Sequence, residues 1–372
     1  MVLGIYILIV VLSLFGSILN RKNLLFEFLI LVGIIFLMGR GANTLDIVNY
    51  KLAYERSPNI SFGMTYEKGY LLIQKICNFV NLNYIQFRVL FTIISWFLIR
   101  KSIGRFTDKP HFIYLFYLLF AIFIDTVQIR NFIAFALVFA GITHLFLPDK
   151  NNKSKFVVII LLATTIHISS VIYLIFGLIN VKNKKDLIKF LVFFTILFCV
   201  AIFMGGNKVP IVEEILSLIN EGRLDAYIGA TTKLGFLYAF FLHFFSIVLL
   251  YYARKISQDV RSMSVNNSST SEIEMRRLVI DAIYWINIVA ILFFPLYMMN
   301  LQFIRLTRNL LILNLVAYSL IQKPLIHQSP KLVLFNFLVF INALSWYYFT
   351  FIIQDHVEDI IDPFFSENQI LS

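Results

Sequence analysis

The sequence predicts an all-α polytopic membrane protein that forms one integral membrane domain over residues 1–372. Of these residues, 59% are hydrophobic, 40 are Phe and only 14% are charged. The mean hydropathy is +0.82, and a soluble domain of this length cannot bury so much apolar surface. Apolar runs of roughly 20 residues, the length that a helix needs to cross a bilayer, recur along the whole chain.

The predicted spans are joined by more polar segments. The first span has no basic residue before it, and Arg21 and Lys22 follow it, so we expect an uncleaved span rather than a signal peptide. The stretch 69–82 is short and amphipathic and is expected to form a helix lying at the membrane interface. With the less regular segment 156–180, the spans give about 10–12 membrane helices. The predicted spans are residues 2–19, 24–39, 84–100, 111–128, 131–148, 187–204, 234–253, 278–298, 304–321 and 332–353.

The segment 156–180 carries His167 and several hydroxyl side chains at the centre of an apolar run, and lysines flank both of its ends. A single crossing would place one of these basic clusters outside the cell. The positive-inside rule instead favours a broken, re-entrant hairpin that returns to the side from which it entered. Non-helical backbone is tolerated at membrane depth only where protein or water covers it, so we expect His167 at the hairpin tip in a polar cavity. The flanking residues are Lys150, Lys153, Lys155, Lys182, Lys184 and Lys185.

The hairpin leads to a topology with both termini outside and most of the 32 Lys and Arg residues on the cytoplasmic side. The net charge of +11 reflects these basic loops and does not require a nucleic-acid partner. The loop 254–277 contains "NNSSTS" and is predicted to be a cytoplasmic linker. The outer segments are the loop 39–83 with its interfacial helix, 125–131, the loop 205–233, 298–304 and 354–372.

Several functional classes are excluded or left without support. Cys77 and Cys199 are the two cysteines, which rules out a disulfide framework. The phosphate-binding, dinucleotide-binding and metalloprotease motifs G-x-x-x-x-G-K-[ST], G-x-G-x-x-G and H-E-x-x-H are absent, as is C-x-x-C. The sequence therefore predicts neither a nucleotide-driven engine nor a metal site, and no cofactor.

The predicted topology gathers polar residues on the outer side. In "GRGANTLDIVNYKLAYE", Asp46, Tyr50 and Tyr54 are four residues apart and share one face of a helix that follows Arg40. Charged groups at membrane depth usually mark a pathway or a site. The planar fork of Arg binds two phosphate oxygens at once, so several Arg near the outer leaflet favour a lipid-linked phosphate or diphosphate ligand. The other candidates are Glu67, Asp125, Gln128, Arg130, His167, Arg223, Asp225, Tyr227, Arg305 and Arg308.

Ordinary structural roles are also open to these residues. Asp46 suits a capping interaction with Asn43, and Glu67 suits a cap for the helix that starts near Thr65. The remaining alternatives are interfacial anchoring for Arg130 and for Arg305 or Arg308, a satisfied core histidine for His167, and plain surface exposure for Arg223.

In these motifs the chain resembles the EpsG/Wzy-type family of bacterial polysaccharide polymerases. Four pieces in order carry the resemblance. The first is the Arg40, Asp46, Tyr50 and Tyr54 pattern with "YEKGY" downstream, which contains Glu67 and Tyr70. The others are "QIRNFIAFALVFAGI" with Gln128 and Arg130, "HISSVIYL" with His167, and "RLDAYIG" with Arg223 and Tyr227, followed by Arg305 and Arg308.

The resemblance implies an enzyme of the bacterial cytoplasmic (inner) membrane. It would join undecaprenyl-diphosphate-linked oligosaccharide repeat units into O antigen, capsule or exopolysaccharide at the outer face of that membrane. By analogy it implies a GT-C-like membrane glycosyltransferase architecture. The partners implied are the lipid-linked oligosaccharide, membrane lipid, a chain-length regulator and a repeat-unit flippase.

Roles for the candidates follow from this chemistry. The leaving diphosphate carries negative charge, which arginines would stabilise, and the acceptor hydroxyl requires a base, for which Asp46 is favoured. Predicted diphosphate ligands are Arg40, Arg130, Arg223, Arg305 and Arg308. Predicted sugar ligands are Tyr50, Tyr54, Gln128 and Tyr227. The candidate bases are Asp46, Glu67 and His167.

Three alternatives stay open. A flippase for the same repeat units would need charged residues along both halves of the membrane. An O-antigen ligase would share the outer-face chemistry but use another acceptor. A non-catalytic scaffold would tolerate replacement of the outer polar residues.

Overall fold

The computed structural model describes residues 1–41, 45–64, 67–146, 150–206, 234–263, 270–323 and 329–366. Over these ranges the secondary structure is helical and contains no strand. Seven of the described helical segments are long and apolar enough to cross a membrane, and two shorter ones, Leu24–Gly39 and Ile168–Asn180, are also apolar. The predicted class of all-α polytopic membrane protein is confirmed. The seven segments are Val2–Leu19, Ile129–Phe146, Lys184–Met204, Phe236–Gln258, Ile273–Met299, Leu301–Leu320 and Pro330–Ile353.

The first two helices have the predicted bounds. Helix α1 (Val2–Leu19) ends because Asn20 adopts the left-handed conformation, with φ 45°. Helix α2 (Leu24–Gly39) begins where the Asn23 side chain accepts a hydrogen bond of 3.1 Å from the backbone N–H of Phe26.

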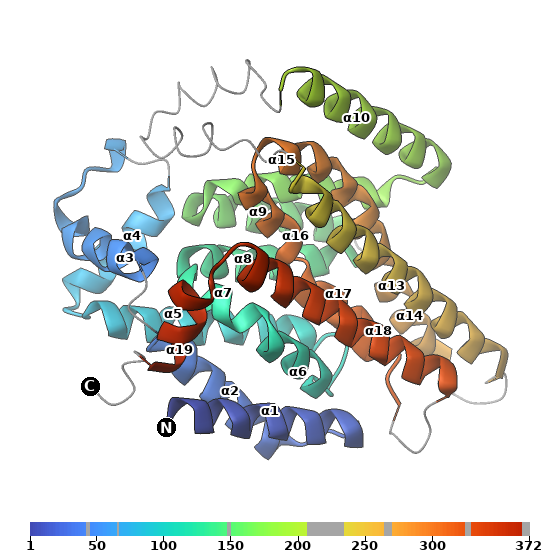
Figure 1. The fold of residues 1–372 in the computed structure, drawn as a ribbon, viewed down its shortest axis with the longest axis horizontal. Coiled ribbons are helices and arrows are strands. Elements are labelled where there is room, and N and C mark those ends of the chain that lie inside the picture. Colours follow the sequence, from blue (N-terminus) through green and yellow to red (C-terminus); the bar gives the residue numbers. More distant parts are fainter. Residues whose placement is uncertain are drawn as a thin grey trace.

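Three helices follow on one side of the molecule: α3 (Leu45–Arg56), α4 (Lys68–Phe79) and α5 (Tyr84–Ile103) (Figure 1). Helix α4 is the helix expected within 69–82, and it buries Tyr70 and Leu71 on one face. Asn83 and Gln86 form a capping box, with hydrogen bonds of 2.8 and 2.9 Å, that starts α5.

The predicted single span 111–128 is divided into α6 (His111–Leu119) and α7 (Ala121–Val127). The break lies at Phe120, whose ring packs 5.8 Å from Trp346 and 5.9 Å from Phe351. The helix break at Phe120 therefore coincides with packing against a distant part of the chain. The largely apolar sequence of 111–128 does not indicate where such a break lies. Helix α8 (Ile129–Ile142) follows a second break at Gln128 and continues as a 3₁₀ turn, Thr143–Phe146.

The predicted break at His167 is present. Helix α9 (Lys150–Ile166) ends there, His167 is extended (φ −141°, ψ 115°), and a 3₁₀ helix η4 (Ile168–Asn180) follows. A Cβ on Gly177 would lie 3.9 Å from the Phe156 ring. These two residues lie on opposite sides of the break and nearly equally far from it, so α9 and η4 are the antiparallel arms of a hairpin.

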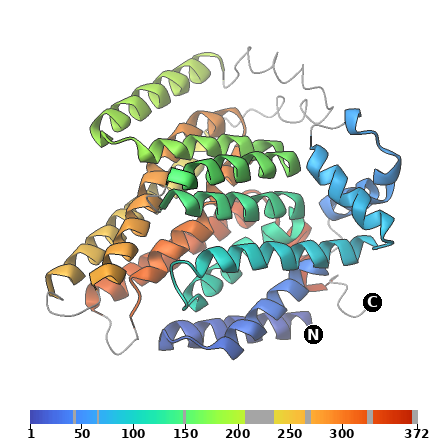
Figure 2. The ribbon, with the colours of Figure 1, turned by 180° about the vertical axis from the view of Figure 1, so that it is seen from behind.

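The remaining helices complete the bundle. Viewed from behind, α2, α5, α8 and α9 lie in successive layers (Figure 2), and each packs on the next. Helix α10 lies at the periphery in Figure 1. The bounds are α10 (Lys184–Met204), α13 (Phe236–Met263), α14 (Thr270–Val289), α15 (Phe294–Met299), α16 (Arg305–Arg308), α17 (Leu311–Leu320), α18 (Pro330–Tyr347), π-helices at Tyr348–Ile353 and Val357–Ile361, and α19 (Asp362–Ser366).

Polar residues within the core are paired across helices. Asn287 of α14 and Asn314 of α17 exchange side-chain hydrogen bonds of 2.7 and 3.2 Å, and His243 Nε2 lies 3.1 Å from the Asn287 carbonyl oxygen. Hydrocarbon offers no partner to such groups, so this pairing lets polar side chains occupy a membrane core.

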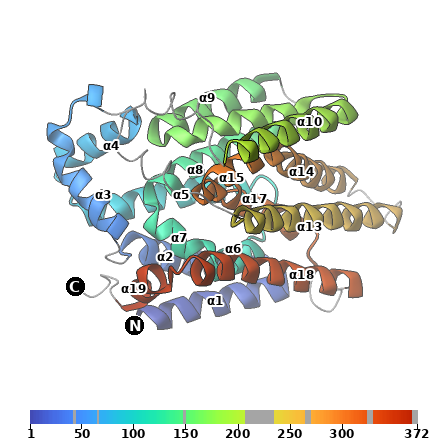
Figure 3. The same cartoon turned by 45° about the horizontal axis from the view of Figure 1, so that its top comes forward.

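The bundle has two distinct ends. Figure 3 shows α3, α4, α7, α19 and the N-terminus at one end, with the far ends of α13 and α14 at the other. At that other end, the Asn20 side-chain amide donates a 2.9 Å hydrogen bond to the Gln322 carbonyl oxygen and joins the chain after α1 to that after α17. The described parts of the predicted outer segments 39–83, 125–131 and 354–372 therefore share an end, and the side of the membrane on which that end lies stays a prediction.

Two predicted loops fall partly outside the described residues. Of the outer loop 205–233, residues 207–233 lie outside them. The flanks of the linker 254–277 are helical, because α13 runs to Met263 and α14 begins at Thr270.

Candidate functional site

Three predicted site residues meet where the start of α4, the start of α8 and the hairpin tip come together. The Arg130 guanidinium forms an ion pair with the Glu67 carboxylate through Nη1 and Oε2. The other carboxylate oxygen, Oε1, lies 3.2 Å from His167 Nδ1 and accepts a 3.2 Å hydrogen bond from the Ile168 backbone N–H. The side chains of Glu67, Arg130 and His167 are 13%, 19% and 9% exposed, so the cluster is largely shielded from solvent.

The environment of Glu67 keeps its carboxylate ionised. Burial alone would raise the pKa of the Glu67 carboxyl, but the hydrogen bond with His167 and the charge of Arg130 outweigh burial and hold that pKa below its ordinary value. Glu67 occupies the N-cap position of α4, yet its side chain makes no capping hydrogen bond. Its carboxylate instead joins α4 to the hairpin.

The contact with Glu67 also determines which nitrogen of His167 carries its proton. A carboxylate at Nδ1 favours the tautomer with the proton on Nδ1, which leaves the lone pair on Nε2. In the part of the chain that the structure describes, Nε2 has no hydrogen-bond partner. The imidazole can therefore accept a proton from a ligand.

Two tyrosine rings flank Arg130. The guanidinium carbon lies 5.7 Å from the ring centre of Tyr50 and 5.8 Å from that of Tyr70. Contacts of this kind stabilise a cation and restrict its orientation. Tyr50 is half-buried on α3. Its ring contact means that Tyr50, a predicted sugar ligand, lies beside Arg130, a predicted diphosphate ligand.

A second cluster brings Gln128 together with Arg308. The Arg308 Nη2 group donates a 2.7 Å hydrogen bond to Gln128 Oε1, and Asp125 provides opposite charge to the same guanidinium. Tyr117 donates a 3.2 Å hydrogen bond to Asp125 Oδ2. Arg308 and Asp125 are buried, so their opposite charges compensate each other away from water.

The two clusters are neighbours. The charge of Arg305 acts on both His167 and Arg308. The Asn309 amide donates a 3.0 Å hydrogen bond to the Tyr173 hydroxyl, which donates 3.1 Å to the Leu306 carbonyl oxygen. These bonds hold the short helix α16, which carries both arginines, against the hairpin.

Three predicted site residues, two candidate ligands and a candidate base, have other surroundings at the end of α2 and on α3. Arg40 lies at the C-terminus of α2, 5.5 Å over the Phe36 ring. Asp46 is exposed in the first turn of α3. The buried Tyr54 hydroxyl donates a 2.6 Å hydrogen bond to the Leu82 carbonyl oxygen, and burial raises its pKa to about 12, so Tyr54 packs α3 against the chain before α5. Arg223 and Tyr227 lie outside the described residues.

Arg88 was not identified by the sequence reasoning. It lies on α5, is 2% exposed, and donates hydrogen bonds to three backbone carbonyls. The sequence did contain a signal for Arg88, because it is a single charged residue near the start of the predicted span 84–100, and burying a charge in a membrane is costly.

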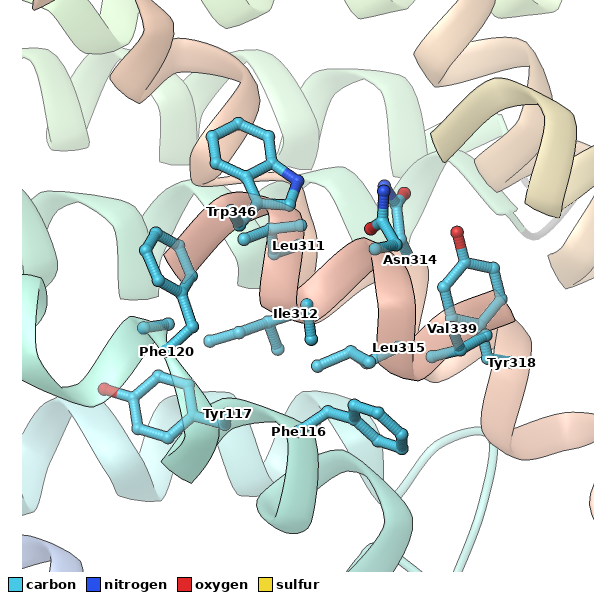
Figure 4. A pocket seen from close by; sticks show the side chains of 13 residues that line it. Phe116, Tyr117, Phe120, Leu311, Ile312, Asn314, Leu315, Tyr318, Val339 and Trp346 are labelled. Atoms are coloured by element: carbon cyan, nitrogen blue, oxygen red, sulfur yellow. The ribbon is translucent and has the colours of Figure 1, made fainter. Parts of the chain in front are cut away.

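A small cavity borders the second cluster, because Tyr117 is among the residues that line it. It measures about 30 Å³ and lies among α6, α17 and α18, with Phe116, Asn314 and Trp346 in its lining (Figure 4). The buried donors Asn342 Nδ2 and Trp346 Nε1 line the same cavity and have no hydrogen-bond partner among the described residues. A cavity of this size accommodates water that could satisfy them. None of the predicted site residues lines it.

Comparison with known proteins identifies a family. The family model described as the EpsG family matches residues 23–358. This range contains every residue of both clusters. Comparison with curated proteins and with solved structures gave no match. Among the described residues no group of three or more His, Cys, Asp or Glu side chains could hold a metal ion.

Proposed function

Because this chain belongs to the EpsG family, we propose that it is a polyprenyl-diphosphate-dependent glycosyltransferase that polymerises polysaccharide. Its substrates are undecaprenyl-diphosphate-linked oligosaccharide repeat units, which it joins at the outer face of the cytoplasmic membrane. The product is an O antigen, capsule or exopolysaccharide. The observation that carries this proposal is the convergence of Glu67, Arg130 and His167 beside two further arginines.

In the proposed reaction, a hydroxyl of the acceptor repeat unit attacks the anomeric carbon of the donor glycan. The bond from that carbon to the diphosphate oxygen breaks, and the polyprenyl diphosphate leaves with the bonding electrons. The hydroxyl proton passes to His167 Nε2. The Glu67 carboxylate at Nδ1 then stabilises the imidazolium, as in other carboxylate–histidine pairs.

His167 is a better candidate for the base than Asp46, which the sequence favoured. The Glu67 carboxylate lies 3.2 Å from Nδ1, where it can orient the imidazole and pair with the imidazolium that forms when Nε2 takes up a proton. Asp46 is exposed on α3, where water would compete for its oxygens.

Arginines stabilise the leaving diphosphate in this proposal. Arg305 and Arg308 lie on one short helix beside His167. Arg130, which is paired with Glu67, would add positive charge near the leaving diphosphate. Arg40 and Arg223 stay candidate diphosphate ligands. A fixed cation stabilises developing negative charge without having to reorient during the reaction.

The setting of this chemistry is part of the proposal. The end of the bundle that carries α3 and α4 faces the outside, both termini lie there, and the helical core follows a GT-C-like organisation. A repeat-unit flippase would supply the substrate, and a chain-length regulator would limit the product.

The test is the length distribution of surface polysaccharide in cells that lack this gene and carry a plasmid copy. Wild type should restore a full ladder. His167→Gln and Glu67→Gln should lower polymerisation on the order of 10²-fold or more, because each removes part of the proton acceptor. Asp46→Asn and the matched control His356→Gln, at a histidine whose side chain is 42% exposed, should keep the ladder.

Other outcomes have distinct meanings. A full ladder from correctly inserted His167→Gln protein contradicts the proposed base. Loss of all surface repeat units on gene deletion indicates a flippase or a ligase, and an unchanged ladder on deletion excludes a polymerase.

A further inference from the structure

Arg88 holds three backbone carbonyls that belong to two different segments of the chain. Its Nη2 donates hydrogen bonds of 2.8 Å to Met38 O and 3.0 Å to Thr126 O, and its Nη1 donates 3.3 Å to Gly41 O. The side chain is buried, and the described residues provide no carboxylate to pair with it. The carbonyl dipoles, with the Tyr84 ring 5.9 Å away, are what compensate this charge.

The three carbonyls lie beside predicted site residues. Met38 and Gly41 bracket Arg40 at the C-terminus of α2, and Thr126 lies at the end of α7, shortly before Gln128 and Arg130. The last carbonyls of a helix lack helical partners and form the negative end of its dipole, so a cation stabilises both helix ends at once. A single guanidinium thus joins the backbone around Arg40 to the backbone that leads into Arg130.

The fit between these segments leaves no spare room. A Cβ added to Gly41 would lie 2.3 Å from Thr126 Cγ2 and 2.9 Å from Arg88 Nη2. Glycine at this position therefore lets the two segments approach closely enough for one side chain to reach both.

We propose that Arg88 is a positioning residue that sets the place of Arg40 relative to Gln128 and Arg130. It does not touch substrate, because its side chain is buried between the segments that it joins. Lysine cannot replace it, since one ammonium lacks the planar fork that serves three carbonyls. The inference rests on the proposed function, in which Arg130 helps to stabilise the leaving diphosphate and Arg40 is a candidate ligand for it.

The test compares Arg88→Lys and Arg88→Leu with Lys101→Met, a matched change of an exposed cation on the same helix. Amide hydrogen exchange is measured on the full-length protein in detergent at Arg40, Gly41 and Gln128, whose N–H groups are bonded near the three carbonyls. Both Arg88 variants should raise exchange at least tenfold at these amides and leave α13 and α14 unchanged. Lys101→Met should change neither region.

Kinetics supply the second readout. Displacement of a reacting or binding group by about 1 Å lowers rates on the order of 10²-fold, so Arg88→Lys should lower kcat by that factor with a small change in KM. Exchange that rises through all helices would mean a merely structural role, and exchange that stays at wild-type values in both segments would overturn the proposal.

The two proposals fail separately. If wild type makes no polymer, the proposed function fails, and the exchange data still decide whether Arg88 fixes the two segments. If wild type polymerises and Arg88→Lys combines local loosening with full activity, the function stands and the positioning role is overturned.

Discussion

At the scale of single residues, Glu67 has the most consequential contacts in the candidate site. One carboxylate oxygen faces Arg130, and the other faces both His167 and the Ile168 N–H. Arg130 belongs to α8, whereas His167 and Ile168 belong to the hairpin, so this side chain links α4, α8 and the hairpin. The same contacts orient the His167 imidazole and restrict the Arg130 guanidinium. Both the placement of these side chains and the proposed proton transfer therefore depend on Glu67.

The pH dependence of this link follows from the lowered pKa of Glu67. A carboxyl whose pKa is lower in the folded than in the unfolded state contributes stability that is complete above the unfolded value, about 4.3, and is lost as the pH falls through the folded value. The Tm difference between wild type and Glu67→Gln should therefore not shrink between pH 8 and about pH 5. It should vanish only in more acidic solution. Thermal unfolding in detergent measures this, and a difference that already fades between about pH 7 and pH 6 would contradict the assigned contacts.

At the scale of elements, interruptions in helices build the site. Breaks at Gln128 and His167 place those residues at helix ends, and a third break at Phe120 separates α6 from α7. Side chains at helix ends are released from the regular helical spacing and can converge on a common point. The packing of α4 against α9 then brings Glu67 to the hairpin tip.

That packing depends on Gly69. A Cβ at this position would lie 2.1 Å from Thr165 Oγ1 and 3.0 Å from the Thr165 carbonyl oxygen, whereas a Cβ on Gly4 would meet nothing within 4 Å. Gly69→Ala should therefore push α4 away from α9, destabilise the protein by about 1–3 kcal/mol and abolish long glycan chains, while Gly4→Ala should do neither. Thermal unfolding and the polysaccharide ladder check both variants. Wild-type values for Gly69→Ala would mean that α4 and α9 are not in close contact.

At the scale of the whole molecule, the polar clusters lie towards the end that carries the N-terminus and α19. The last described residues fold back onto this end: Phe364 is 1% exposed, and its ring lies 6.5 Å from Tyr6 of α1 and 4.9 Å from Phe123 of α7. Through Phe364 the C-terminal segment braces the helix that precedes Gln128, while its acidic side chains Asp355, Glu358 and Asp359 are exposed.

The sidedness of this end can be measured in intact cells. Val48 is exposed on α3 and Lys101 is exposed towards the other end of α5. With Cys199 replaced by Ser, a membrane-impermeant maleimide should label Val48→Cys in intact cells. It should label Lys101→Cys only after permeabilisation, because basic segments stay inside. The reverse pattern would refute outer-face chemistry by this protein.

The sequence by itself determined the membrane class, the bounds of α1 and α2 and the break at His167, and it singled out Glu67, Arg130 and His167 as candidates, which the structure brings together. These features depend on local properties: apolar length, a capping Asn, and polar groups too expensive to place at membrane depth without a function. Tertiary structure alone decided that Glu67 faces His167, that Phe120 interrupts a span and that Arg88 joins two segments. Each of these depends on contacts between residues far apart in the chain, and neither composition nor periodicity encodes which distant partner a side chain meets.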